Sequence, residues 1–186
     1  MRKRLRAIPA ARRRRAAERL SERVLDLFAV REAANVFLCL SFGVEIDTWH
    51  LLDGLTDLGK RTYVPRVVLD DRSFHVHPYP CRMDTLTIGL RQPAATEPEL
   101  PEADLDSTLD VALILGMAFD HRGVRLGHGG GFFDRFLARH PLNTVGLAYD
   151  EQISDRLPRE SHDVPMQQVV TPSRVLVPSA RPAPTD

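Results

Sequence analysis

A glycine-rich segment in the second half of the chain has the composition of a phosphate-binding loop. It consists of Arg125-Leu126-Gly127-His128-Gly129-Gly130-Gly131-Phe132-Phe133-Asp134-Arg135. Glycines let backbone N–H groups approach an anion without an intervening Cβ atom, and a helix that follows directs the positive end of its dipole to the same place. Arg125 and Arg135 can pair with phosphate oxygens, and Asp134, in the first helical turn, can hold Mg²⁺ against them. The segment therefore predicts phosphate binding.

Neither of the two common nucleotide-binding fingerprints fits this segment. A Walker loop would end in Gly-Lys-Ser or Gly-Lys-Thr, whereas this one ends in Gly-Phe-Phe-Asp. A dinucleotide fingerprint that starts at Gly127 would need glycine where the chain has Phe132. The remaining alternative is a flexible turn with a glycine helix cap, in which Asp134 only stabilises the helix dipole, by about 0.3–1 kcal/mol.

The glycine-rich segment belongs to a longer pattern that resembles the signature of the 5-formyltetrahydrofolate cyclo-ligases, also called methenyltetrahydrofolate synthetases. From Gly116-Met117-Ala118-Phe119-Asp120 to Arg135, the chain is similar to the family's G-x-A-F-D-x-x-G-x-R-L-G-x-G-(G/K)-G-Y-Y-D-R. Four further pieces follow the family's order: Val44-Glu45-Ile46-Asp47-Thr48, Gly59-Lys60-Arg61-Thr62-Tyr63-Val64-Pro65-Arg66, Ile88-Gly89-Leu90-Arg91-Gln92-Pro93 and His162-Asp163-Val164-Pro165-Met166. The resemblance covers nearly the whole chain.

The resemblance implies an enzyme that cyclises 5-formyltetrahydrofolate, including its polyglutamylated forms, to 5,10-methenyltetrahydrofolate. ATP and Mg²⁺ are the implied cofactors, and ADP and phosphate are released. An amide-like formyl group is a poor electrophile, so transfer of the γ-phosphoryl group to its oxygen would make an intermediate that N10 of the folate can attack. The protein would mainly position the reactants and stabilise charge.

The same resemblance implies a role for individual residues. The catalytic residues are Arg125, Asp134 and Arg135. The ATP contacts are Arg2, Arg6, Arg125, Leu126, Gly127, His128, Gly129, Gly130, Gly131, Phe132 and Phe133. The folate contacts are Leu40, Glu45, Gly130, Gly131 and Phe132, and the carboxylate of Glu45 suits the adjacent N–H donors of a pterin edge. The metal ligands are Asp134 and Gln167. The plainer interpretation of Glu45 is a solvated loop carboxylate beside a helix cap.

Three features depart from the family pattern. Phe132-Phe133 replaces the usual Tyr-Tyr, so two hydroxyl groups are missing. Gln167 replaces the aspartate after Val-Pro-Met, which should weaken Mg²⁺ binding. Arg2-Lys3-Arg4-Leu5-Arg6 fits the family's basic K-x-x-L-R element, but counting back from Glu45 also allows that element to lie upstream of Met1. These departures permit a second hypothesis, a diverged member that binds nucleotide or folate without efficient turnover.

The elements that would position these residues alternate between helix and strand. Apolar runs predict strands at residues 35–40, 61–65, 109–116, 144–149 and 169–171, with helices at 10–28, after Thr48 and after the glycine-rich segment. Alternation at 73–77 predicts a short antiparallel strand, and the Pro-rich stretch 92–101 an exposed loop. With the resemblance, this predicts an α/β domain over residues 1–177: a Rossmann-like three-layer sandwich with a mostly parallel central sheet, a short antiparallel strand pair and a disordered tail at 178–186.

Charge is distributed unevenly along the chain. Eight basic residues precede the first acidic residue, Glu18, so the rest of the chain is net negative by eight charges. A nucleic-acid or membrane-surface arm, a transit-like segment and a lining for polyanionic ligands would each account for the basic residues 1–15. The favoured interpretation of Arg12 to Arg15 is a solvated helix face, because apolar residues form the opposite stripe. Nucleic-acid binding ranks last among the functions considered.

Length and composition favour one compact domain. The chain has 186 residues, of which 43% are hydrophobic, and no apolar run approaches the ~20 residues of a membrane helix. Cys39 and Cys81 offer neither a disulfide framework nor metal-ligand spacing. We therefore expect a cytoplasmic, monomeric protein without membrane or nucleic-acid partners.

Overall fold

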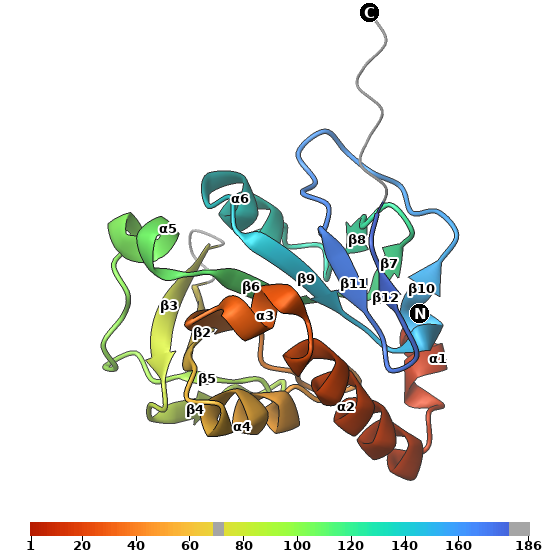
Figure 1. Cartoon of the computed structure of the whole chain (residues 1–186), viewed down its shortest axis with the longest axis horizontal. Coiled ribbons are helices and arrows are strands. Elements are labelled where there is room, and N and C mark those ends of the chain that lie inside the picture. The colour runs from red at the N-terminus through yellow and green to blue at the C-terminus, as the bar shows by residue number, and fades with distance from the viewer. Residues whose placement is uncertain (69–72, 179–186) are drawn as a thin grey trace, which may run out of the picture.

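A mostly parallel sheet of seven strands runs through the middle of the molecule (Figure 1), in the order β12-β11-β9-β6-β1-β2-β3. The computed structural model describes residues 1–68 and 73–178. Only the two edge strands, β12 and β3, run antiparallel to their neighbours. The strands are β1 (Asn35–Leu38), β2 (Arg61–Val68), β3 (Ser73–Tyr79), β6 (Val111–Leu115), β9 (Asn143–Leu147), β11 (Gln168–Val170) and β12 (Val175–Leu176).

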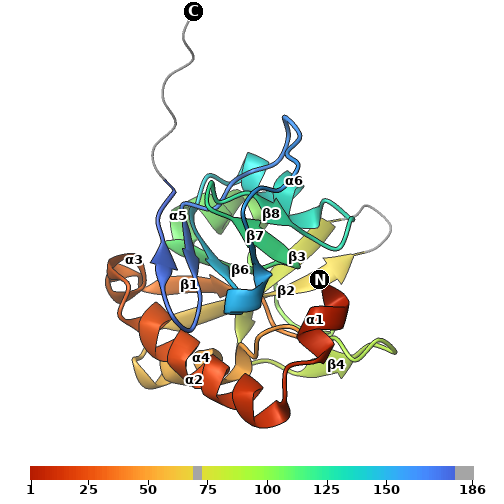
Figure 2. The same cartoon turned by 90° about the vertical axis from the view of Figure 1, so that its right-hand side faces the viewer.

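Helices cover both faces of this sheet. Figures 1 and 2 show α2, α3 and α4 on one face and α6 on the other, which confirms the predicted three layers. The aromatic ring of Phe136 on α6 stacks on that of Phe37 on β1, with centroids 5.4 Å apart. The helices are α1 (Arg2–Arg6), α2 (Ala10–Leu25), α3 (Phe28–Glu32), α4 (Trp49–Asp57), α5 (Leu105–Thr108) and α6 (Phe132–Arg139), with 3₁₀ turns at η1 (Glu102–Asp104) and η2 (Asp150–Gln152).

The predicted first helix, residues 10–28, is divided in two. α2 buries one stripe, at Ala17, Leu20 and Val24, as the apolar spacing predicts. It ends at Leu25 because Leu27 is extended, with ψ of 135°, and the turn lets Val30 of α3 reach the core. The basic run 12–15 is therefore part of a helix that packs on the sheet. No helix among residues 1–68 and 73–178 combines the length and apolarity needed to cross a bilayer.

The prediction of an exposed loop at residues 92–101 is wrong at its start. A hairpin of β4 (Met83–Thr85) and β5 (Arg91–Pro93) occupies this part of the chain, and Gln92 is only 2% exposed. The Gln92 side-chain carbonyl accepts a hydrogen bond from the Val67 N–H at 3.1 Å. This amide satisfies a backbone donor of β2, which explains why a polar residue is buried here. The predicted antiparallel strand at 73–77 is confirmed as part of β3.

A second, three-stranded sheet separates β6 from the glycine-rich segment. It contains β7 (Ala118–Asp120), β8 (Arg125–Leu126) and β10 (Ile153–Ser154), none of which the sequence analysis predicted. The glycine-rich segment therefore begins in β8, the second strand of a β-hairpin, and does not directly follow the apolar strand β6. The predicted disordered tail lies outside the described residues except for Pro178.

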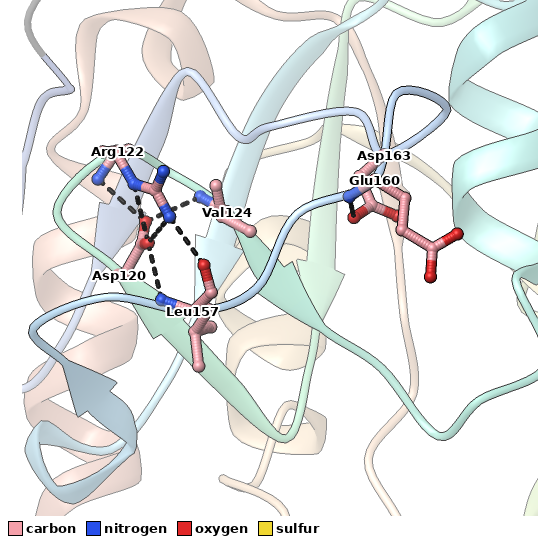
Figure 3. Close-up of polar contacts among 6 residues, drawn as sticks. All are labelled: Asp120, Arg122, Val124, Leu157, Glu160 and Asp163. Carbon is pink, nitrogen blue, oxygen red and sulfur yellow. Dashed lines mark hydrogen bonds and ion pairs between the residues drawn. The ribbon is translucent and has the colours of Figure 1, made fainter.

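A fully buried carboxylate, that of Asp120, holds this small sheet together (Figure 3). Its oxygens accept hydrogen bonds from the N–H groups of Arg122 at 2.9 Å, Val124 at 3.1 Å and Leu157 at 3.0 Å, and from the Arg122 guanidinium at 2.7 Å. Burial alone would raise the pKa of Asp120, but these hydrogen bonds outweigh burial and lower it below the usual value of a carboxyl group. Asp120 therefore fixes the hairpin from which Arg125 projects.

Candidate active site

A cavity of about 340 Å³ opens at the carboxyl ends of β1 and β6. The chain leaves β1 toward β2 on one side and leaves β6 toward β9 on the other, so this is the point where the strand order reverses. Ligands of open α/β sheets bind in the crevice at such a switch point. Ten residues assigned from the sequence line the cavity: Leu40, Glu45, Arg125, Gly127, His128, Gly130, Gly131, Phe132, Phe133 and Asp134.

The glycine-rich segment ends where α6 begins. Gly129 and Gly131 have φ of +90° and +63°, a left-handed conformation that suits glycine. Gly131 is the N-cap residue of α6, and no side chain caps the first turn. Donor groups at the start of α6 are thus left for an anion, together with the positive end of the helix dipole. Arg135 supports the turn by donating a hydrogen bond to the Gly130 carbonyl at 2.8 Å.

Arg125 and Asp134 form an ion pair in the cavity wall. Arg125 Nη2 lies 2.8 Å from Asp134 Oδ1, and the two side chains are 2% and 17% exposed. The Arg125 guanidinium also lies 5.1 Å from the centre of the Phe133 ring. Burial lowers the pKa of Arg125, and the neighbouring Asp134 carboxylate opposes that shift. The structure thus brings together two residues that the sequence assigned separately to phosphate and metal.

Two nitrogens of Arg125 remain without partners. Its Nε and Nη1 atoms are buried, and neither has a hydrogen bond to a described residue. Leaving a buried donor unsatisfied costs about 1–3 kcal/mol, more for a charged group. A carbonyl or phosphate oxygen that enters the cavity and accepts these hydrogen bonds would remove that cost. Arg125 is thus a buried, incompletely paired cation in the lining of the cavity.

The hydrogen-bonded side chains of Glu45 and His128 line another side of the cavity. Glu45 Oε2 accepts a hydrogen bond from the Phe42 N–H at 3.0 Å, and its Oε1 lies 3.0 Å from His128 Nε2. His128 Nδ1 lies 3.2 Å from Arg2 Nη2 on α1. Because a guanidinium can only donate, Nδ1 is the acceptor and Nε2 carries the proton that His128 donates to Glu45. Arg2 therefore contacts the glycine-rich segment, although it does not line the cavity. Arg6, the other basic residue assigned to ATP on α1, is exposed.

Comparisons with known proteins identify the family of this chain. One protein-family model, described as the 5-formyltetrahydrofolate cyclo-ligase family, matches residues 1–172. The chain belongs to this family. The cyclo-ligase of Escherichia coli K12 is 36% identical over 187 residues, which cover 94% of this chain and 98% of that protein. That of Mycolicibacterium smegmatis is 36% identical over 143 residues, covering 73% and 72%.

Structural comparison agrees on the fold of this cyclo-ligase family member. The NMR structure of Aquifex aeolicus 5,10-methenyltetrahydrofolate synthetase superposes with a TM-score of 0.78 at 24% identity. The superposition covers 96% of this chain and 89% of that protein. The overall fold of this chain is thus one already known for this family.

Gln167, one of the two predicted metal ligands, is not brought to the cavity. Its side-chain carbonyl accepts a hydrogen bond from the Thr144 N–H at 3.2 Å, and its own N–H donates to Thr144 Oγ1 at 3.0 Å. Both residues lie at the amino ends of their strands, β11 and β9, whereas the cavity lies at carboxyl ends. Asp120 offers no replacement, because it is fully buried and its two oxygens already accept hydrogen bonds.

Gln167→Ala should therefore leave cyclisation nearly unchanged. A side chain outside the cavity is expected to alter kcat/KM by less than about threefold, whereas loss of a metal-site group typically costs about 10–100-fold. The measurement is the initial rate as MgCl₂ is varied, for Gln167→Ala and for Asp134→Asn in parallel. A Mg²⁺ requirement that rises as much in Gln167→Ala as in Asp134→Asn would contradict this placement.

Sequence reasoning missed one wall of the site. The tip of the β4–β5 hairpin contributes Ile88, Leu90 and Arg91 to the cavity, and Ile88 is 65% exposed. The Arg91 guanidinium lies 4.2 Å above the Trp49 ring, which joins the hairpin to α4. The available signal was the family-like piece at residues 88–93, to which no site role was assigned. Of the other assigned residues, Leu126 is 45% exposed on β8, and neither it nor Gly129 lines the cavity.

Proposed function

We propose that this protein converts 5-formyltetrahydrofolate to 5,10-methenyltetrahydrofolate with hydrolysis of ATP to ADP and phosphate. Membership of the cyclo-ligase family supports this activity. The structural observation that carries it is the buried Arg125, whose two unpartnered nitrogens lie in the wall of a cavity beside the start of α6. A cation there can balance the charge of a phosphoryl group and of the oxygen to which it is transferred.

ATP is the proposed phosphoryl donor, bound by its phosphates at the glycine-rich segment. The uncapped first turn of α6 supplies N–H donors and the helix dipole, and Arg135 holds the carbonyl of Gly130 so that the segment keeps its shape. Phe132 and Phe133 replace the family's two tyrosines, but both rings line the cavity and can pack on a ligand without hydroxyl groups. Arg2 reaches the segment through His128 and adds positive charge.

Asp134 is the residue that suits Mg²⁺. Its Oδ1 is used by Arg125 and, at 3.4 Å, by the Val164 N–H, whereas no hydrogen bond from a described residue reaches Oδ2. Mg²⁺ is commonly held by one or two carboxylates together with substrate phosphates and waters, so a single carboxylate oxygen fits such a site. The ion would neutralise phosphate charge. No role is assigned to Gln167.

Glu45 is proposed to bind the pterin. Its side chain is 6% exposed, and both oxygens already accept hydrogen bonds, one of them from the partly exposed His128. The adjacent N–H donors of a pterin edge can replace the His128 donor, since His128 is 40% exposed and can turn to solvent. Leu40 and Phe132 then contact the apolar part of the ring system.

In the proposed reaction, the γ-phosphoryl group moves to the formyl oxygen and ADP leaves. N10 attacks the formyl carbon, the C–O bond to phosphate breaks, and N10 loses its proton, so the formyl oxygen ends in inorganic phosphate. The residues named above contribute by positioning and charge stabilisation. We extend the proposal to polyglutamylated folates, a monomeric state and a cytoplasmic location. The free thiols of Cys39 and Cys81 fit the reducing conditions of the cytoplasm.

The test is a spectrophotometric assay for the methenyl product. Purified full-length protein is mixed with 5-formyltetrahydrofolate, ATP and MgCl₂, and each component is omitted in turn. We expect absorbance of the product to rise only when all are present, with one ADP formed for each product molecule. No rise with folded protein would refute the proposal. Calorimetric binding of ATP or folate without turnover would then identify a diverged binding protein.

A further inference from the structure

Two histidines and a glutamate meet at the edge of the sheet, away from the cavity just described. His75 and His77 are two residues apart on β3, so their side chains point to the same face. Residues 98–100 run beside this edge strand, where the Leu100 N–H donates to the Val76 carbonyl at 2.7 Å. One potential ligand atom from each of His75, His77 and Glu99 lies within 4.8 Å of those of the other two.

His77 already has the arrangement of a metal-binding histidine. It is 2% exposed, and its Nδ1 lies 2.9 Å from the Pro98 carbonyl oxygen. Because a carbonyl can only accept, Nδ1 carries the proton and Nε2 has a free lone pair. That Nε2 atom is buried and has no hydrogen-bond partner among the described residues. Metal-binding histidines usually donate their other N–H to a carbonyl or carboxylate, which fixes the ring.

His75 and Glu99 can rearrange at little cost. His75 Nδ1 lies 2.6 Å from Glu99 Oε2, and the two side chains are 47% and 52% exposed. An exposed contact of this kind contributes little to stability, so it can open to bind a cation. The pair by itself accounts for His75 and Glu99 but not for the buried, unsatisfied nitrogen of His77. A ligand that accepts its lone pair accounts for all three residues.

The local charge does not oppose a cation strongly. Arg66 is opposite His75 in the β2–β3 register, and Arg139, which lies near this edge, pairs with Glu102 at 2.8 Å. The Arg66 guanidinium is engaged elsewhere, since Nη1 donates to the Pro93 carbonyl and lies 3.7 Å from Asp84 Oδ2. A small cavity of about 190 Å³, lined in part by His75 and Glu99, leaves room for a water ligand. Access from solvent is therefore open.

We propose that His75, His77 and Glu99 bind one divalent transition metal ion of the zinc class. Two imidazoles and one carboxylate are ligands that Zn²⁺ and Co²⁺ accept readily, with a fourth position left for water. The ion would add a second link between residues 98–100 and β3, beside the bridge that Leu100 already makes to Val76. None of these residues lines the proposed catalytic cavity, so the site is independent of the ATP-dependent reaction.

The test is a titration of metal-free, full-length protein with ZnCl₂ in competition with a chromogenic zinc indicator. We expect one Zn²⁺ per chain, and at least about a tenfold loss of affinity in His75→Gln and in Glu99→Gln. His75 and Glu99 are about half exposed, so both variants should fold. The test therefore does not depend on the folding of a variant at the buried His77. ZnCl₂ should also raise the melting temperature of the wild type and not that of His75→Gln.

His162→Gln is the matched control, because His162 is also exposed and lies 3.6 Å from Glu160 and 3.7 Å from Asp163. It should bind Zn²⁺ like the wild type. The proposal is overturned if the wild type binds no stoichiometric Zn²⁺, or if His162→Gln loses as much affinity as His75→Gln. It is also overturned if binding is lost in Asp134→Asn and kept in Glu99→Gln, since the ion would then occupy the catalytic cavity.

Discussion

Arg125→Met is expected to lower kcat/KM for folate cyclisation by about 10²–10³-fold, the range found when one preorganised charge-stabilising donor is removed. Two nitrogens of Arg125, a residue that lines the cavity, have no hydrogen-bond partner among the described residues. Methionine keeps an apolar stem of similar length but removes these donors and the charge. The measurement is the initial rate of methenyl formation at subsaturating folate, with ADP release followed in parallel.

Arg125→Lys separates charge from geometry in the same experiment. Lysine keeps a positive charge but lacks the planar fork, so we expect a loss between those of the wild type and Arg125→Met. Arg139→Met is the control, since Arg139 lies on α6 but is 54% exposed and pairs with Glu102 at the surface. Far-ultraviolet circular dichroism and thermal unfolding check that Asp134, left without its partner, does not unfold the protein. An Arg125→Met rate within about threefold of the control would refute the assignment.

The parallel sheet could be predicted because its strands carry local signals. Val111–Leu115 is buried at every residue and forms a continuous apolar run, as expected for a strand covered on both faces. The alternation in β3 likewise follows from one face packing on α6 and the other facing the segment at residues 98–100. The start of α6 was predictable because Gly131 adopts a conformation that few other residues adopt.

The small second sheet could not be predicted, because its strands have two or three residues and depend on contacts distant in sequence. β7 pairs with β10, and just beyond β10 the Leu157 N–H donates to the Asp120 carboxylate, 37 residues away in sequence. The arrangement of the candidate active site also could not be predicted, because it depends on contacts between elements. Arg125 and Asp134 pair only because the hairpin places one beside the first turn of α6, whereas the sequence suggested separate partners for them. Gln167 was assigned by its position in a motif, and its partner Thr144 carried no sequence signal.

Asp120→Ala is expected to lower the free energy of unfolding at pH 7 by about 3–5 kcal/mol, the usual cost of removing one partner of a buried charged pair. Three backbone N–H groups, those of Arg122, Val124 and Leu157, lose their acceptor at once. Urea unfolding followed by circular dichroism measures the change. Asp155→Ala is the control, because Asp155 is exposed in the same region, and its effect should stay within about 0.5 kcal/mol.

Acid should remove this difference. The pKa of Asp120 is lowered in the folded protein by its hydrogen bonds, so the folded state binds that proton less readily than the unfolded chain, whose carboxyl has a pKa of about 3.9. The contribution of Asp120 is therefore complete above the unfolded pKa and is lost as the pH falls through the lower, folded value. The difference in stability between wild type and Asp120→Ala should begin to shrink below about pH 4 and should be lost only when the pH is below the folded pKa of Asp120. A difference that stays unchanged well below pH ~4, where Asp120 is protonated in both states, would show that packing of the side chain, rather than its charge, holds the hairpin that carries Arg125.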